Sequence, residues 1–193
     1  CNCVGTKTTS NTCIGPQSEI TAYAYDTIPG NLLNDLLNDP DFPGMPNRSF
    51  ELSQFGIGWE NEVDSSGTLV QAYLTVPVSG DYQFNLTGNN NCIVYISSDE
   101  DPANKTDNEL MVFWSSNPTE HDKYPEQTSN VLSLTAGEYY YVELNHKEGS
   151  FSEHFSLFWQ TPFNEPGQWK RISDFYLYDY IGLMYFYMFT EKC

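Results

Sequence analysis

Basic residues are scarce in this sequence. Its 193 residues include 8 lysines and arginines against 26 aspartates and glutamates, which gives a formal net charge of −18 at pH 7. The negative electrostatic field of such a chain repels the phosphates of nucleic acids and the headgroups of anionic membranes. The sequence also lacks any apolar stretch of the roughly 20 residues that a membrane-spanning helix needs. We therefore expect no nucleic acid as a partner and no direct insertion into a membrane.

The patterns that mark metal centres and catalytic sites are also missing. The sequence has no CxxC pair and no histidine at metal-ligand spacing, so a zinc site has little support. His121, His146 and His154 have no cysteine or GxSxG serine beside them, which favours structural or exposed positions over catalytic ones. Acidic pairs for glycoside hydrolysis always exist among 26 acids, but a substrate cleft on one small domain is uncommon. We predict no catalytic residues and no enzymatic activity.

The five cysteines indicate disulfide bonds. An odd number leaves at least one thiol free or bonded to another chain. The chain begins without a methionine or a signal peptide, which suggests a processed segment of a secreted protein. The candidates for disulfide bonds are Cys1, Cys3, Cys13, Cys92 and Cys193.

Three N-glycosylation motifs point to the same extracellular setting. They begin at Asn47, Asn85 and Asn104. In the expected strand around Asn85, the side chains of Tyr82, Phe84 and Leu86 share one face, and Asn85 lies on the other. We therefore expect a glycan on Asn85 to point into solvent.

Alternating apolar positions predict an all-β fold. Aromatic residues make up 16% of the chain, a composition typical of folded β proteins. A two-residue period with one apolar face predicts an antiparallel β-sandwich of two sheets packed face to face. A further strand is expected over 20–25 and a helical turn over 32–37. The expected central strands cover 69–78, 82–87, 93–97, 131–134, 139–145 and 155–159. The expected organisation is a Cys/Thr-rich N-terminal arm (1–19), a sandwich (20–175) and an aromatic C-terminal extension that ends in cysteine (176–193).

The aromatic extension has two interpretations. It is either a last strand buried in the sandwich or a surface that a neighbouring subunit covers, because aromatic side chains are costly to leave in water. Residues 180–190 carry no charge. The candidate assembly residues are Phe175, Tyr176, Tyr178, Tyr180, Tyr185, Phe186, Tyr187 and Phe189.

Several segments together resemble the protective-antigen-14 domain family. They are "VPVSGDYQFNL" (76–86), "CIVYISSDEDPANK" (92–105), "LTAGEYYYVELNHKEG" (134–149) and "FSLFWQTP" (155–162), preceded by "DTIPGNLLNDLLNDPDFPGMP" (26–46). The resemblance covers about residues 20–175. It implies a β-sandwich in an extracellular and often glycan-related setting.

The resemblance also implies a place for a ligand site. In adhesin members of the family, the loop after the strand that corresponds to 82–86 carries an Asp-Asp pair, which holds a calcium ion that binds sugar hydroxyls. Counting from Phe84 places that pair at Asn89 and Asn90. Replacing two carboxylates with amides removes two charges from the calcium site. Calcium is therefore disfavoured and no cofactor is required, and we expect a plain turn here. The candidate ligand or metal loop comprises Asn89, Asn90, Asn91, Asp99 and Asp101.

Two functions from different classes remain. The first is a glycosylated, disulfide-stabilised subunit of an extracellular coat, fibre or filament, whose partners are copies of itself or another extracellular protein. The second is a carbohydrate-binding or adhesion module that uses the loops within 88–101. The asparagines at 89 and 90 favour the first, and the family resemblance favours the second.

Overall fold

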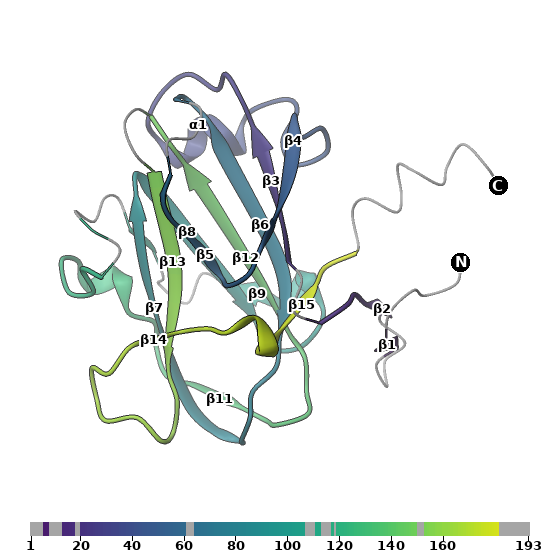
Figure 1. The fold of residues 1–193 in the computed structure, drawn as a ribbon, viewed down its shortest axis with the longest axis vertical. Coiled ribbons are helices and arrows are strands. Elements are labelled where there is room, and N and C mark those ends of the chain that lie inside the picture. The colour runs from purple at the N-terminus through teal and green to yellow at the C-terminus, as the bar shows by residue number, and fades with distance from the viewer. Residues whose placement is uncertain are drawn as a thin grey trace.

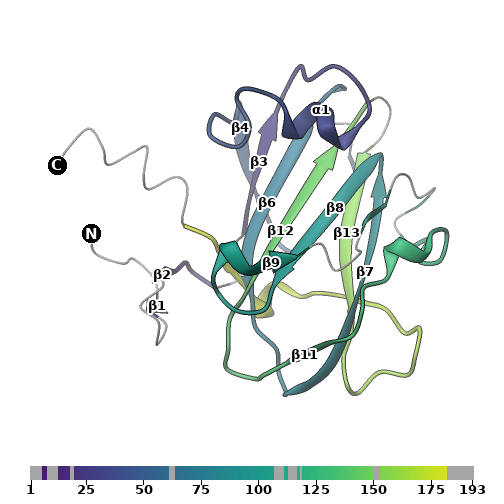
Figure 2. The same cartoon turned by 180° about the vertical axis from the view of Figure 1, so that it is seen from behind.

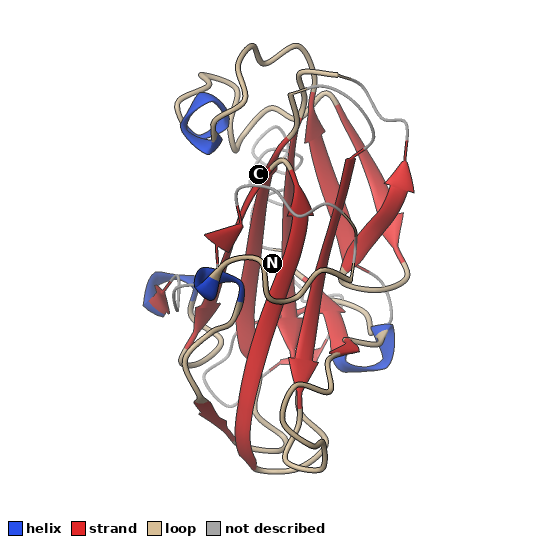
Figure 3. Cartoon of the chain, turned by 90° about the vertical axis from the view of Figure 1, so that its left-hand side faces the viewer, coloured by secondary structure: helices blue, strands red, loops and turns tan. Residues whose placement is uncertain are grey.

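Two antiparallel β-sheets pack face to face to form the molecule (Figure 3). The computed structural model describes residues 6–7, 13–17, 20–60, 64–106, 111–112, 117, 119–149 and 153–181. The predicted all-β, antiparallel two-sheet sandwich is confirmed. None of the helices within these ranges has the length and apolar character needed to cross a membrane.

The larger sheet has the strand order β10-β8-β12-β6-β3-β4, with β15 on β6 and β9 on β8 (Figure 1). Its centre is the β6–β12 pair, in register from Gly67 opposite Lys147 to Leu74 opposite Tyr140. Every residue of both strands is buried, so the outer face of this sheet is covered as well at its centre. The strands are β3 (Ile20–Tyr25), β4 (Arg48–Leu52), β6 (Gly67–Leu74), β8 (Asn91–Ser97), β9 (Lys105–Thr106), β10 (Met111–Val112), β12 (Tyr140–Lys147) and β15 (Leu177–Asp179).

The smaller sheet has the order β11-β7-β13-β14, with β5 on β13. Its main pair is β7 with β13, in register from Asn89 opposite His154 to Gln83 opposite Gln160. A separate hairpin, β1 (Thr6–Lys7) with β2 (Cys13–Ile14), stands beside the sandwich (Figure 1). The strands of the smaller sheet are β5 (Gly56–Glu60), β7 (Gly80–Asn89), β11 (Leu132–Leu134), β13 (Glu153–Gln160) and β14 (Lys170–Arg171).

The core between the sheets follows the predicted alternation. Phe84 and Leu86 of β7 meet Val94 of β8 and Val142 and Leu144 of β12, and all five are almost fully buried. Burying an apolar side chain of this size contributes about 1.5–3 kcal/mol. The parity of each strand therefore decides which of its residues reach the interior.

A short helix closes one end of the sandwich (Figure 2). Helix α1 (Leu33–Leu37) lies within the helical turn predicted over 32–37. The Asp35 carboxylate accepts a hydrogen bond from the Leu32 backbone N–H at 2.9 Å, which caps the first turn. Leu36 is fully buried against Tyr25 and Leu69. This end of the molecule is called the helix end below.

The two longest strands that are absent from the sequence-based prediction are β4 and β5. Strand β4 lies at the edge of the larger sheet, and β5 has glycine at two of its five positions. Glycine is depleted in strands because it offers no side chain to pack. The local sequence pattern therefore did not indicate a strand at β5. This strand forms because it pairs with β13, which is distant in the sequence.

The predicted exposure of Asn85 is wrong. Asn85 is 0% exposed because the segment after residue 118 lies over the outer face of β7. Its side-chain amide donates to the His121 carbonyl at 2.9 Å and to the Thr128 hydroxyl at 3.0 Å. The His121 Nδ1 lies 2.7 Å from the Asn85 Oδ1. The amide nitrogen that would carry the glycan is thus enclosed by protein.

Glycosylation should follow this difference in burial. Asn47 and Asn104 are exposed, whereas a glycan on Asn85 would displace the covering segment. In protein secreted from a eukaryotic host, glycopeptide mass spectrometry of the folded monodisperse fraction should find glycans at Asn47 and Asn104 and none at Asn85. Full occupancy of Asn85 in folded protein would contradict the packing on β7.

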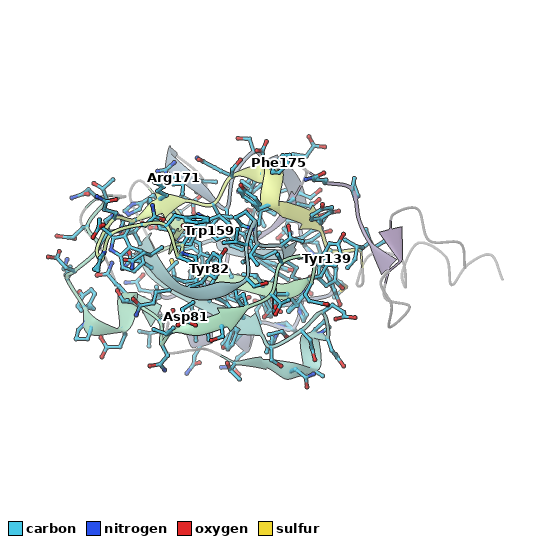
Figure 4. The ribbon with its side chains drawn as sticks, turned by 90° about the horizontal axis from the view of Figure 1, so that it is seen from below. Asp81, Tyr82, Tyr139, Trp159, Arg171 and Phe175 are labelled. Atoms are coloured by element: carbon cyan, nitrogen blue, oxygen red, sulfur yellow. The ribbon has the colours of Figure 1, made fainter. Side chains whose placement is uncertain are left out.

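The start of the aromatic extension packs within the chain. Strand β15 pairs with β6, and Leu177 is buried in the core. Tyr176 stacks on Trp159 with ring centroids 5.1 Å apart, and Tyr178 meets Tyr139 at 5.2 Å. Figure 4 shows Trp159, Tyr139 and Phe175 in the view from below, and Phe175 is 62% exposed.

The aromatic residues therefore divide into two sets. Tyr176, Tyr178 and Tyr180 are half-buried by contacts with their own chain, and their predicted role in assembly stays a prediction. The ring of Tyr180 packs against the rings of Tyr73 and Tyr141, with distances between ring centroids of 5.5 and 5.0 Å. The other predicted assembly residues, Tyr185, Phe186, Tyr187 and Phe189, lie outside the described residues.

Cys92 is a buried free thiol, which corrects its place among the disulfide candidates. It faces the core from β8, beside Val94 and Ile96 in the same cluster. Burial, together with the nearby carboxylates of Glu148 and Glu153, raises its pKa well above the ordinary range. The thiol is therefore neutral and unreactive. Cys1, Cys3 and Cys193, and the side chain of Cys13, lie outside the described part of the chain.

Candidate functional site

The three asparagines form the crossing between the two sheets at the helix end. Strand β7 ends at Asn89 in the smaller sheet and β8 begins at Asn91 in the larger one. The Asn89–Asn90 peptide bond is cis. The Asn90 Oδ1 accepts from the Gly149 backbone N–H at 2.9 Å, and the Asn90 amide donates to the Asn89 Oδ1 at 3.0 Å. Asn89 and Asn91 are thus strand residues, and the chain bends at Asn90, where side-chain hydrogen bonds hold the crossing.

These contacts bring three loops together. The Asn91 amide donates to the Asn31 carbonyl before α1. The loop after β12 joins the same cluster through Gly149, whose carbonyl accepts from the Ser65 N–H at 3.0 Å. Asn31 is exposed, and Asn90 and Asn91 are half-buried. Asn31, Asn90 and Asn91, which lie over the buried Gly149, form what is called the amide surface below.

The structure does not bring Asp99 and Asp101 to this surface. They follow β8, whose seven residues place its two ends roughly 20 Å apart. Both carboxylates organise their own loop: Asp99 accepts from the Asp101 N–H at 2.9 Å, and Asp101 accepts from the Ala103 N–H at 2.9 Å. The expected single ligand loop therefore separates into two unrelated turns.

A buried polar cluster beneath the amide surface is missing from the prediction. His146 and Glu148, at the end of β12, and Glu153 of β13 are 0%, 1% and 2% exposed. The His146 Nε2 lies 2.7 Å from the Asn89 carbonyl oxygen. One ligand atom from each of the three residues lies within 4.8 Å of the other two. His146 shares the core-facing parity of Val142 and Leu144, and this was the one signal in the sequence that could have found the cluster.

A second polar network occupies the outer face of the larger sheet. Glu143 of β12 accepts hydrogen bonds from Lys105 at 2.7 Å, from the Tyr141 hydroxyl at 2.6 Å and from Asn145 at 3.1 Å. Burial alone would raise the pKa of Glu143, but the bonds from Lys105, Tyr141 and Asn145 outweigh it and lower the pKa. Burial and the same carboxylate raise the pKa of Tyr141. Glu143 is therefore ionised and Tyr141 is a neutral donor.

Removing Lys105 should destabilise this network. A Lys105→Ala variant leaves the Glu143 carboxylate buried without its cation, and we expect the free energy of unfolding to fall by about 2 kcal/mol. Urea unfolding of the two proteins measures the difference. Lys123→Ala removes a partly exposed pair with Glu120 at 3.8 Å and should cost about 0.5 kcal/mol. Equal losses in the two variants would contradict a special role for Lys105.

The fold and the loops together define an antiparallel β-sandwich module whose crossing loop joins its two sheets at one end. The sequence matches the PA14 domain family over residues 67–166, more than half of the chain. The chain therefore belongs to the PA14 domain family.

One curated relative and two solved structures are similar to the chain. N-acetyl-beta-glucosaminyl-glycoprotein 4-beta-N-acetylgalactosaminyltransferase 1 of Mus musculus is 24% identical over 155 residues, which cover 75% of this chain and 14% of the mouse protein. The PA14 sugar-binding domain from RTX adhesin has a TM-score of 0.61 at 8% identity, covering 86% of this chain and 100% of that chain. The Epithelial Adhesin 6 A domain from Candida glabrata, in complex with Galb1-3GlcNAc, has a TM-score of 0.56 at 13% identity and covers 88% of this chain and 89% of that chain. The two structures establish a shared fold, and the chain spans only a small part of the mouse protein.

Proposed function

We propose that this domain is a non-enzymatic carbohydrate-binding module of an extracellular protein and that the amide surface carries its binding site. The observation that carries the proposal is the joining of three loops by the Asn90–Gly149 and Asn91–Asn31 hydrogen bonds. Binding sites need polar groups held in fixed positions. An asparagine amide both donates and accepts hydrogen bonds, as sugar hydroxyls do.

The relatives support the same choice. One structural neighbour is described as a sugar-binding domain, another was solved with a disaccharide, and the mouse relative is named for a transferase that acts on glycoproteins. A domain that spans 14% of that transferase is an accessory part in our proposal and does not carry its catalysis.

A glycan array with and without a calcium chelator tests the proposal. We expect binding to at least one glycan class, and an Asn91→Ala variant should weaken that binding because it frees the loop before α1. The matched control is Asn130→Ala, at an exposed position outside the amide surface. An array with no bound glycan, or equal loss in both variants, would rule out the amide surface as the site.

The affinity for calcium should depend on the charge of the crossing loop. The native amides at 89 and 90 are expected to give little or no calcium binding, since calcium needs anionic oxygen ligands. An Asn89→Asp/Asn90→Asp variant should gain a calcium-dependent rise in melting temperature and at least about tenfold tighter calcium binding by calorimetry. A calcium response of the native protein as strong as that of the variant would show that amides suffice.

The role as an assembly subunit remains a prediction. Of its candidate residues, Phe175 is the exposed one among those that the structure describes. Comparison of reduced and non-reduced native material by mass analysis would test covalent assembly directly.

A further inference from the structure

The outer face of the larger sheet is rich in tyrosine. On β12 the side chain of Val142 enters the core, so those of Tyr141 and Glu143 lie on the opposite face. The register places Tyr73 of β6 beside Tyr141, and Tyr95 of β8 beside Glu143. The first residues of the aromatic extension join the same cluster. The surface called the tyrosine face below is formed by Tyr73, Tyr95, Tyr141, Tyr178 and Tyr180.

The tyrosine face keeps accessible aromatic surface. Tyr73 and Tyr141 are buried, whereas Tyr95, Tyr178 and Tyr180 are half-buried. The face of an aromatic ring carries partial negative charge and attracts cations. Tyrosine is also enriched where proteins bind other proteins. The accessible rings therefore favour a partner that carries positive charge.

Lys105 shows how this face holds a cation. Its Nζ lies 5.1 Å from the ring centroid of Tyr95 and 6.0 Å from that of Tyr141. The same ammonium donates to the Glu143 Oε2 at 2.7 Å, and the side chain of Lys105 is 33% exposed. Rings and a carboxylate thus act on one ammonium group close to solvent.

Further carboxylates border the tyrosine face. The Tyr141 N–H donates to the Asp99 carbonyl at 3.0 Å, which holds the 99–101 loop against β12. Burial raises the pKa of Tyr73, and the carboxylates of Glu100 and Asp101 contribute to the rise because they lie nearby. Glu100 is half-buried and Asp101 is exposed. Charge complementarity at this border again favours a basic partner.

A buried amide leaves an acceptor on the same face. Gln71 lies beside Glu143 in the sheet and is 5% exposed. Its Nε2 donates to the Tyr141 hydroxyl at 2.6 Å, while its Oε1 has no hydrogen-bond partner among the described residues. Lysine and arginine side chains carry donors and no acceptor, so they match a face whose remaining polar groups accept.

We propose that the tyrosine face binds a lysine- or arginine-rich segment of a partner protein. Such a segment meets aromatic rings, carboxylates and an amide oxygen, each of which attracts a cationic donor. A second copy of this chain does not suit the face, because two chains of net charge −18 repel each other. The interaction does not depend on carbohydrate binding, since none of the asparagines of the amide surface takes part.

Fluorescence anisotropy of a labelled octalysine peptide, titrated with the full chain at physiological ionic strength, tests the proposal. We expect saturable one-to-one binding. A Glu100→Gln/Asp101→Asn variant should bind about threefold more weakly or worse, because it removes two charges at the border of the face. The control, Glu126→Gln/Glu165→Gln, removes two exposed charges from segments next to the smaller sheet and should bind like the native chain. Absence of saturable binding, or equal weakening in the two variants, would overturn the proposal.

The aromatic contribution is tested separately at Tyr180. Tyr180→Phe keeps the ring and should bind the peptide like the native chain, whereas Tyr180→Leu should bind roughly two- to fivefold more weakly. Both variants keep the net charge, so the difference isolates the ring. Equal affinities in the two variants would contradict a binding face built on tyrosine.

Removal of Lys105 tests whether the peptide uses the same place. Lys105→Ala should bind octalysine more tightly than Lys123→Ala, because only the first change frees the rings and the carboxylate of the tyrosine face. Each variant loses one positive charge, so general attraction rises equally in both. Equal affinities would show that the peptide binds elsewhere and would overturn the assignment to this face.

Discussion

Alanine at position 56 is expected to lower the free energy of unfolding by about 3 kcal/mol or more. Gly56 has a φ angle of +152°, which side chains rarely adopt. A Cβ atom there would lie 2.5 Å from the Phe155 carbonyl oxygen and 2.7 Å from the Ser156 Cα. Both atoms belong to the backbone of β13, so the clash can be relieved only by moving β5 away from its partner strand.

Gly167 provides the matched control. Its φ angle of +79° is also positive, but no heavy atom within the described residues lies within 4 Å of the position that a Cβ would take. Gly167→Ala should therefore cost about 1 kcal/mol, from backbone strain alone. Urea unfolding of both variants separates steric exclusion from strain. Equal losses would mean that β5 shifts without cost.

Local patterns were sufficient for much of the fold. The expected strand over 20–25 coincides with β3. It could be predicted because the apolar residues that form the strand and the residues that end it all lie within a few positions of each other. The alternation of Tyr82, Phe84 and Leu86 correctly identified the core face of β7. In both cases the information lies in neighbouring residues.

Contacts between distant segments explain what the sequence could not provide. The outer face of β7 looked solvent-exposed because nothing near Asn85 reveals that residues about 40 positions later cover it. Asp99 follows Asn89–Asn91 closely in the chain, yet the intervening strand carries it to the other end of the sheet. His146, Glu148 and Glu153 meet only because the turn after β12 brings β13 into the opposite sheet. Closeness in sequence thus led to a wrong grouping of Asp99 with the asparagines, whereas the closeness of His146, Glu148 and Glu153 was not recognised as a cluster.

The segment that covers β7 depends on one buried glutamine. Gln127 lies in the short 3-10 helix Pro125–Gln127 and is fully buried. Its amide donates to the Leu86 carbonyl at 2.9 Å and to the Glu120 carbonyl at 2.7 Å, and its Oε1 accepts from the Tyr124 N–H at 3.0 Å. It therefore binds the covering segment both to itself and to the strand beneath.

Gln127→Leu should cost about 3 kcal/mol, because it preserves the size of the side chain but removes three hydrogen bonds to backbone groups, one of them buried and two partly buried. Hydrogen exchange should report the same event locally, as lost protection of the amides of Thr128 and Ser129, which bond to Pro125 and Phe84. Gln168→Leu, at an exposed position, should change stability by no more than about 0.5 kcal/mol. If Gln127→Leu were equally mild, packing alone would hold the segment on β7. The burial of Asn85 would then follow from the shape of the segment, and its hydrogen bonds would contribute little.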